Sequence, residues 1–138
     1  MSATYLLDTN TVSYIANGRS PAARGRLQAL DIEDVVCISS ITEAEIRYGL
    51  ARRPHARALR AAVENLLFKL CVLPWGSKEA AAYGELRAQL EAKGASLAEL
   101  DMLIAAQAIA QGAVLVSNDR AFSYLAAFHR VKNWADDI

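Results

Sequence analysis

Cysteines, long apolar runs and targeting segments are all scarce in this sequence. The two cysteines, Cys37 and Cys71, lie in apolar, strand-like stretches, which favours buried free thiols in a reducing cytoplasm over a disulfide or a metal ligand. No apolar run reaches the ~18 residues of a membrane span, because Gln107 and Gln111 interrupt the best candidate. The N-terminus lacks a basic segment followed by a long apolar one, so we expect no signal peptide. These absences predict a cytoplasmic protein with no membrane association.

Several widespread catalytic motifs are missing as well. The chain has no G-x-x-x-x-G-K-[ST] or G-x-G-x-x-G phosphate loop, no G-x-S-x-G nucleophile and no H-E-x-x-H zinc motif. Its two histidines, His55 and His129, lie in basic or aromatic surroundings that favour surface or packing roles over catalysis. A hydrolase built from this sequence would therefore depend on carboxylates together with a bound metal ion.

Charge is balanced overall but unevenly distributed. The 138 residues carry 15 basic and 15 acidic side chains, which excludes a polybasic nucleic-acid binder. No acid occurs between Glu45 and Glu64, where five arginines crowd together: Arg47, Arg52, Arg53, Arg57 and Arg60. Because the guanidinium fork suits phosphate groups, Arg47, Arg52 and Arg53 are candidate RNA contacts, with a solvated helix face as the alternative.

Short apolar segments alternate with helical patterns along the whole chain. Strands are expected at residues 4–7, 35–39, 70–73, 114–117 and 131–134. Helices are expected at about residues 9–16, 21–30, 40–51, 59–67, 77–94, 96–111 and 120–128, with capping boxes at 40–43 and 96–99 and a cap at Ser77. This alternation predicts a single domain over residues 1–138, a three-layer α/β/α sandwich around a mainly parallel sheet.

Two aspartates directly follow predicted strands. Asp8 comes after the first strand and Asp119 after the fourth. In open parallel sheets, ligands bind beyond the carboxyl ends of the strands, so both side chains are candidate functional groups. Each could instead be the N-cap of the helix that follows, because aspartate is a favoured capping residue.

Two further acids lie on helix faces where a solvated charge is not expected. Asp101 falls on the apolar stripe of its helix, opposite Glu99, and stabilisation of the first helical turn is the alternative to a functional role. Glu45 faces the expected cleft, whereas Glu43 lies on the outward side, four residues before an arginine. A capping box with Thr42 is the alternative role for Glu45.

Four carboxylates that converge would repel one another, and burial would raise their pKa values further. A divalent cation reverses this cost, and an all-oxygen donor set suits Mg²⁺ or Mn²⁺ rather than zinc. Such an ion activates water and clamps phosphoryl oxygens, so the acids predict phosphodiester hydrolysis. Thr9, Asn10 and Ser117 are candidates for orienting the carboxylates, or else for turn and cap hydrogen bonds.

Five short motifs occur in order over nearly the whole chain: LLDTN at 6–10, ITEAEIRYG at 41–49, YGELR at 83–87, DMLIAA at 101–106 and LVSND at 115–119. Together they resemble the PIN-domain ribonucleases and, more narrowly, the VapC toxins of bacterial type II toxin–antitoxin pairs. The resemblance implies a Mg²⁺- or Mn²⁺-dependent endoribonuclease that cuts transfer or ribosomal RNA. It also implies a homodimer and a hetero-oligomer with a VapB-type antitoxin that neutralises it.

By the same resemblance, the four acids of the family correspond to catalytic, metal-binding residues of this chain, namely Asp8, Glu45, Asp101 and Asp119. The chain departs from many relatives at Ala98, where they have glycine. A non-catalytic PIN-like module that binds RNA or protein is the alternative, although such a module has little use for a buried acidic cluster. An aspartyl phosphatase or receiver domain is disfavoured, because Asn10 stands where its second aspartate would be.

Overall fold

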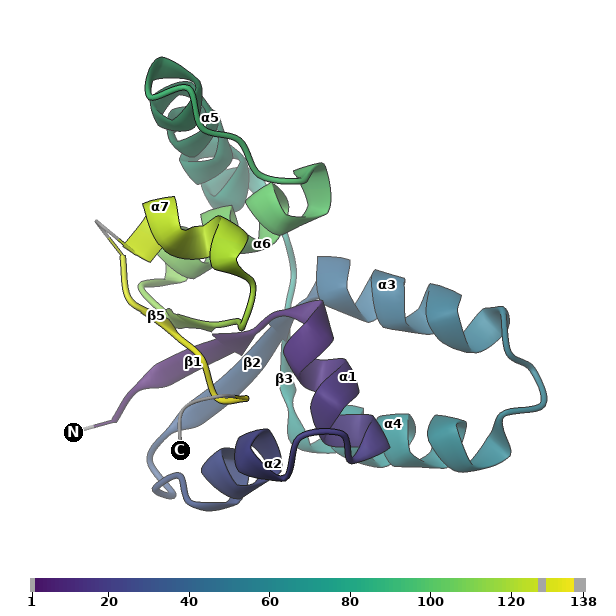
Figure 1. The fold of residues 1–138 in the computed structure, drawn as a ribbon. Coiled ribbons are helices and arrows are strands. Elements are labelled where there is room, and N and C mark those ends of the chain that lie inside the picture. Colours follow the sequence, from purple (N-terminus) through teal and green to yellow (C-terminus); the bar gives the residue numbers. More distant parts are fainter. Residues whose placement is uncertain (1, 127–128, 136–138) are drawn as a thin grey trace.

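The centre of the molecule is a sheet of five parallel strands in the order β3-β2-β1-β4-β5 (Figure 1). The computed structural model describes residues 2–126 and 129–135. The strands are β1 Thr4–Leu7, β2 Val35–Ser39, β3 Cys71–Leu73, β4 Val114–Val116 and β5 Val131–Lys132. Because all five run in the same direction, their carboxyl ends meet at one edge of the sheet, with β1 in the middle.

Helices cover both faces of this sheet: α1 Thr9–Asn17, α2 Pro21–Gln28, α3 Ser40–Ala51, α4 Arg57–Lys69, α5 Ser77–Ala92, α6 Glu99–Gln111, the 3₁₀ helix η1 Arg120–Phe122 and α7 Ser123–Ala126. Successive side chains of β1 point to opposite faces and divide the core between them. Leu6 packs with Leu86 of α5 and Ile104 of α6. Leu7 packs on the other face with Val12 of α1. The predicted three-layer α/β/α sandwich is therefore confirmed.

The predicted boundaries of the elements agree with the structure to within a few residues. The third strand begins at Cys71 instead of residue 70, and the last ends at Lys132 instead of residue 134. The helix expected at 120–128 is a 3₁₀ turn followed by α7, and its last two residues lie outside the described part. Residue 1 and residues 136–138 of the predicted domain also lie outside it.

Both predicted capping boxes are wrong. The N-cap of α3 is Ser39, whose hydroxyl accepts a hydrogen bond from the backbone N–H of Ile41 at 3.0 Å. Ser40 is already inside the helix, and its hydroxyl accepts from the backbone N–H of Trp75 at 3.2 Å. The N-cap of α6 is Ala98, whose side chain has no oxygen to form a cap. A capping hydroxyl must stand on the extended residue before the helix, and the tertiary structure shifts both starts away from the predicted serines.

The start of α5 is stabilised by Glu79 and not by the predicted cap, Ser77. The Glu79 carboxylate accepts from the backbone N–H of Gly76 at 2.9 Å and from the side-chain amide of Gln111 at 2.9 Å. It thereby joins the first turn of α5 to the end of α6. The Gly76 N–H is the main reason why the pKa of this buried carboxyl is lowered.

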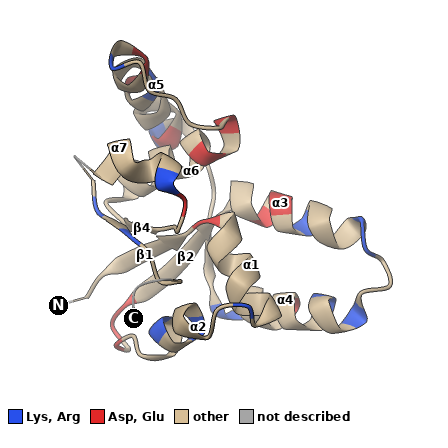
Figure 2. Cartoon of the chain, in the orientation of Figure 1, with Lys and Arg blue, Asp and Glu red and all other residues tan. Residues whose placement is uncertain are grey.

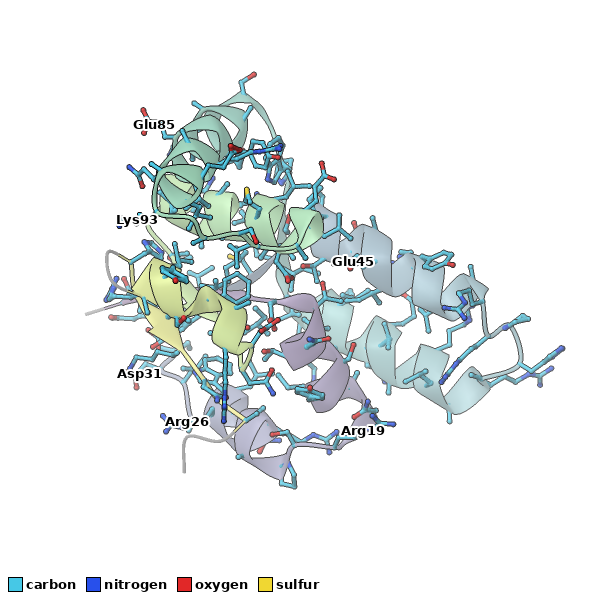
Figure 3. All side chains as sticks on the ribbon, turned by 45° about the horizontal axis from the view of Figure 1, so that its top comes forward. Arg19, Arg26, Asp31, Glu45, Glu85 and Lys93 are labelled. Carbon is cyan, nitrogen blue, oxygen red and sulfur yellow. The ribbon has the colours of Figure 1, made fainter. Side chains whose placement is uncertain are left out.

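We expect Glu79→Ala to lower the free energy of unfolding by about 2 kcal/mol, because two part-buried hydrogen bonds to one carboxylate are lost. A lowered folded-state pKa means that this stabilisation is present above the ordinary pKa and is lost as pH falls through the folded-state value. Urea unfolding at pH 7 and at acid pH measures both effects. Glu85→Ala is the matched control, since Glu85 is exposed on the same helix (Figure 3). An equal change in both variants would contradict the assignment.

The two cysteines are both free, as expected, but only one is buried. Cys37 lies in β2 inside the core, and its burial, followed by the proximity of Cys71, raises its pKa to about 12. Cys71 is exposed, because β3 forms an edge of the sheet. The prediction of two buried thiols is therefore wrong for Cys71. Among the residues described, no helix has the length and apolar character needed to cross a membrane.

Helices α3 and α4 form a hairpin that projects from the body of the molecule (Figure 1). The two helices are joined by residues 52–56. Arg47 of α3 forms an ion pair with Glu64 of α4 and a second, longer one with Glu43 at 3.9 Å. The arginines between Glu45 and Glu64 in the sequence lie on this hairpin, several of them close to its tip (Figure 2).

Candidate active site

Asp8 and Asp119 lie at the carboxyl ends of the neighbouring strands β1 and β4, and both are also helix caps. The Asp8 carboxylate accepts from the backbone N–H of Thr11 at 2.9 Å and caps α1. The Asp119 carboxylate accepts from the backbone N–H of Ala121 at 2.9 Å and caps η1. The two sequence interpretations are thus compatible, because a cap uses one carboxylate oxygen and leaves the other for a ligand.

Glu45 points from α3 toward the start of α1. The Thr9 hydroxyl donates a hydrogen bond of 2.6 Å to Glu45 Oε1. Thr9 also lies 3.3 Å from the hydroxyl of Thr42, a fully buried residue one turn before Glu45. Glu43 faces outward and lies near Arg47 instead. The structure therefore places the two glutamates of α3 on the different sides that the helical projection predicts.

Asp101, in the first turn of α6, completes the arrangement. Asp8, Glu45 and Asp101 line one hollow, which we call the acid hollow, together with Thr9, Asn10, Ala98, Glu99 and Leu100. Figure 2 shows acidic segments of α3, α6 and the strand ends facing the same region. Glu99 was expected on the opposite, outer side of its helix, but it lies at this hollow as an exposed residue.

Burial and neighbouring negative charges raise the pKa of two of the acids, Asp101 and Asp8. Burial raises the pKa of Asp101, and the charges of Asp119, Asp8 and Glu45 raise it further, in that order. Burial also raises the pKa of Asp8, against the opposing effect of hydrogen bonds from Ser117 and Thr11. No lysine or arginine lines the acid hollow among the described residues. Its negative charge is therefore uncompensated by the side chains around it.

The donor set fits a hard divalent cation. The side chains of the acid hollow offer oxygen ligands, and their mutual repulsion would be relieved by a positive charge. Within residues 2–126 and 129–135, no three carboxylate, imidazole or thiol groups form a ready-made metal cage. Mg²⁺ does not require such a group, because it usually retains several waters and uses only one or two carboxylates.

The residues predicted to orient the acids have different positions. Thr9 bonds to Glu45, and the Ser117 hydroxyl bonds to Asp8 and accepts from the backbone N–H of Asp119 at 3.0 Å. Asn10 is exposed in the acid hollow. Sequence reasoning missed Thr11, whose hydroxyl donates to the carbonyl of Val116 at 3.2 Å and ties α1 to β4. Its position three residues after an aspartate cap was the available signal.

The three arginines predicted to contact RNA also have different positions. Arg47 is held in its ion pairs and lines neither hollow near the acids. Arg52 and Arg53 line a second hollow that adjoins the acid hollow. The Arg52 guanidinium lies over the ring of Tyr48, 5.6 Å from its centroid. The structure thus leaves Arg52 and Arg53 as candidates for contacts with a ligand and gives Arg47 a role between helices.

Comparison with known proteins agrees with this architecture. The model of the PIN domain matches residues 5–127. The chain belongs to the PIN domain family. This PIN domain is 36% identical to Ribonuclease VapC2 of Haemophilus influenzae, over 94% of this chain and 97% of that protein. It is 31% identical to the tRNA(fMet)-specific endonuclease VapC of Salmonella typhimurium, with the same coverage of both.

Solved structures give the same relationship. The PIN domain described here matches VapBC2 from Rickettsia felis bound to a promoter DNA fragment, with a TM-score of 0.87 and 32% identity. The match covers 95% of this chain and 98% of that one. DNA-bound VapBC from Salmonella typhimurium matches with a TM-score of 0.84 and 31% identity, over 96% and 98% of the two chains. The similarity therefore extends over nearly the whole chain.

Proposed function

We propose that the chain is the toxin of a type II toxin–antitoxin pair, an endoribonuclease that hydrolyses RNA phosphodiester bonds with Mg²⁺ or Mn²⁺. The observation that carries this proposal is the acid hollow of a PIN domain, where Asp8, Glu45 and Asp101 meet without a cation among the lining side chains. The charge of Asp119 adds to theirs at Asp101. Relatives named as ribonucleases over nearly their full length favour catalysis over a non-catalytic binding module.

Asp8 and Asp101 are the residues that would hold the ion most directly, with Glu45 and Asp119 beside them. Bound there, a divalent ion would lower the pKa of a water and neutralise charge on the phosphoryl group. Thr11 and Ser117 fix the Asp8 carboxylate. These hydrogen bonds hold it in place before substrate arrives.

Glu45 is suited to move a proton. Thr9 bonds to its Oε1, whereas Oε2 has no hydrogen-bond partner within the described part of the chain. A fixed carboxylate with one unbonded oxygen can accept the proton of the attacking water. Asp119 does not line the acid hollow but follows the strand next to Asp8, and its negative charge acts on both Asp8 and Asp101.

The protein partner follows from the solved relatives. Those structures are VapBC complexes, two of them bound to DNA. We propose that this chain likewise forms a hetero-oligomer with a VapB-type antitoxin in the cytoplasm, and that it is a homodimer within that assembly. The uncompensated acids would attract a basic antitoxin side chain, which would block the site by a charge-assisted hydrogen bond.

Sequencing of RNA ends after induced expression tests the activity. We expect the unchanged chain to create new ends in transfer or ribosomal RNA and Asp8→Asn to create none. Asparagine is as good an N-cap as aspartate, so this variant keeps the start of α1. Co-expression with the protein of the neighbouring reading frame should remove the new ends. If Asp8→Asn, expressed at the same level, produced the same ends, the acids would not be the catalytic site.

A further inference from the structure

A second hollow adjoins the acid hollow and is not used by the mechanism above. It lies between α1, α3 and α4, has a volume of about 470 Å³, and shares Thr9 and Glu45 with the acid hollow. We call it the arginine hollow, after Arg19, Arg52 and Arg53 in its lining. Its volume is within the range of small-ligand sites.

The arginine hollow has an apolar floor and a basic rim. Side chains of Ile46, Leu50 and Val63, all buried, form part of the floor. Arg19 follows α1, whereas Arg52 and Arg53 follow α3, so the basic residues come from two separate turns. Figure 3 shows Glu45 and Arg19 near opposite ends of α1. The hollow is therefore acidic where it meets the catalytic residues and basic at its far end.

The three arginines of this hollow have no acidic partner, in contrast to Arg47, which pairs with Glu43 and Glu64. Within residues 2–126 and 129–135, none of the three forms an ion pair, and Glu45 is the single acid of the lining. The ring of Tyr48 supports the Arg52 guanidinium by a cation–π contact. Arginines held without a carboxylate are suited to pair with phosphate groups.

We propose that the arginine hollow holds an unpaired nucleotide of the RNA beside the scissile bond. The proposal rests on the ribonuclease function proposed above and names the part of the substrate that this site recognises. The base lies on the apolar floor, and the adjoining phosphate pairs with Arg52 and Arg53. From Glu45 to Arg52 the helix rises by about 10 Å, since each residue adds 1.5 Å, so a short strand along α3 reaches both sites.

The chemistry of the lining favours RNA in a single-stranded form. An apolar floor accepts a base face, which is exposed only when the base is unstacked and unpaired. Ser13 and Asn17 of α1 line the same hollow and offer a hydroxyl and an amide to the edge of the base. The basic rim repels a basic peptide segment. The site would therefore select cleavage positions in loops.

Gly49 allows the hollow to be filled without disturbing the fold. It lies in α3 within the lining, and a Cβ added there meets no atom within 4 Å. Gly49→Leu should occupy the space of the base, whereas Gly49→Ala should leave most of it open. Both replace glycine in a helix by a better helix former, so both should fold at least as well as the unchanged chain. We expect cleavage of total bacterial RNA to fall at least about tenfold only with leucine.

The arginines are tested by binding of a labelled single-stranded RNA of mixed sequence, in Mg²⁺ and on an Asp101→Asn background that keeps the RNA intact. The pair Arg52→Gln with Arg53→Gln should weaken binding at least about tenfold and flatten the slope of log K against log salt by about 1.4, for two lost phosphate contacts. Arg57→Gln together with Arg47→Gln is the control, with the same loss of charge on the same hairpin outside the hollow.

The outcomes separate this proposal from the ribonuclease function. If the unchanged chain cleaves RNA and Gly49→Leu cleaves it equally, the arginine hollow does not hold a nucleotide, although the nuclease stands. Equal effects of the two arginine pairs on the salt slope would also overturn the proposal, because a diffuse charge effect would explain them. Normal cleavage by Gly49→Leu with loss of antitoxin binding would assign the hollow to the antitoxin. If the unchanged chain cleaves no RNA, both proposals fail.

Discussion

We expect Glu45→Gln to lower RNA cleavage at least about a hundredfold and Glu43→Gln to leave it within about twofold of the unchanged chain. The two glutamates are two residues apart in α3, carry the same charge and are replaced by the same isosteric amide. They differ in where they point. Glu45 is fixed by Thr9 in the acid hollow, whereas Glu43 lies beside Arg47 on the outer face.

Toxicity in growing cells and cleavage of purified RNA should report the same contrast. Glutamine at position 45 can still accept from the Thr9 hydroxyl, so the thermal midpoint should change little and loss of activity would not reflect unfolding. An inactive but folded Glu43→Gln beside an active Glu45→Gln would show that the catalytic face of α3 is the opposite one.

Removal of divalent metal should have the second large effect. EDTA should abolish cleavage, and added Mg²⁺ or Mn²⁺ should restore it. The ion should also stabilise the fold, because a ligand at a hundred times its Kd adds about 2.7 kcal/mol to the free energy of unfolding. The thermal midpoint should therefore rise with Mn²⁺ in the unchanged chain and much less in Asp101→Asn.

The stability of the metal-free protein should change with pH in a defined direction. Burial and the neighbouring acids raise the pKa of Asp8 and Asp101 above the ordinary value. The folded state then binds protons more tightly than the unfolded one, so stability falls as pH rises through the ordinary and then the folded-state pKa. Mn²⁺ should reduce this loss of stability.

Full RNA cleavage in EDTA by a preparation free of contaminating nuclease would contradict the metal-dependent mechanism.

The sequence by itself determined the layers of the fold and the acids worth testing. Alternating apolar strands and amphipathic helices leave few arrangements other than a parallel sheet covered on both faces. Since the carboxyl ends of parallel strands share one edge, Asp8 and Asp119 were predictable at the same edge of the sheet without coordinates. That their strands are neighbours came from the structure. The helical periodicity of α3 also distinguished Glu45 from Glu43, because the local geometry of a helix determines which side each residue faces.

Only the tertiary structure decided which partners these side chains have. Arg47 is paired with Glu64, 17 residues away on another helix, so the sequence could not distinguish it from Arg52 and Arg53. Cys71 is exposed because β3 is an edge strand of the sheet, and a local sequence pattern does not give the order of the strands. The arginine hollow likewise requires α1, α3 and α4 to be placed in space. Contacts between distant segments depend on the packing of the whole core, whereas periodicity reports only what lies within a few residues.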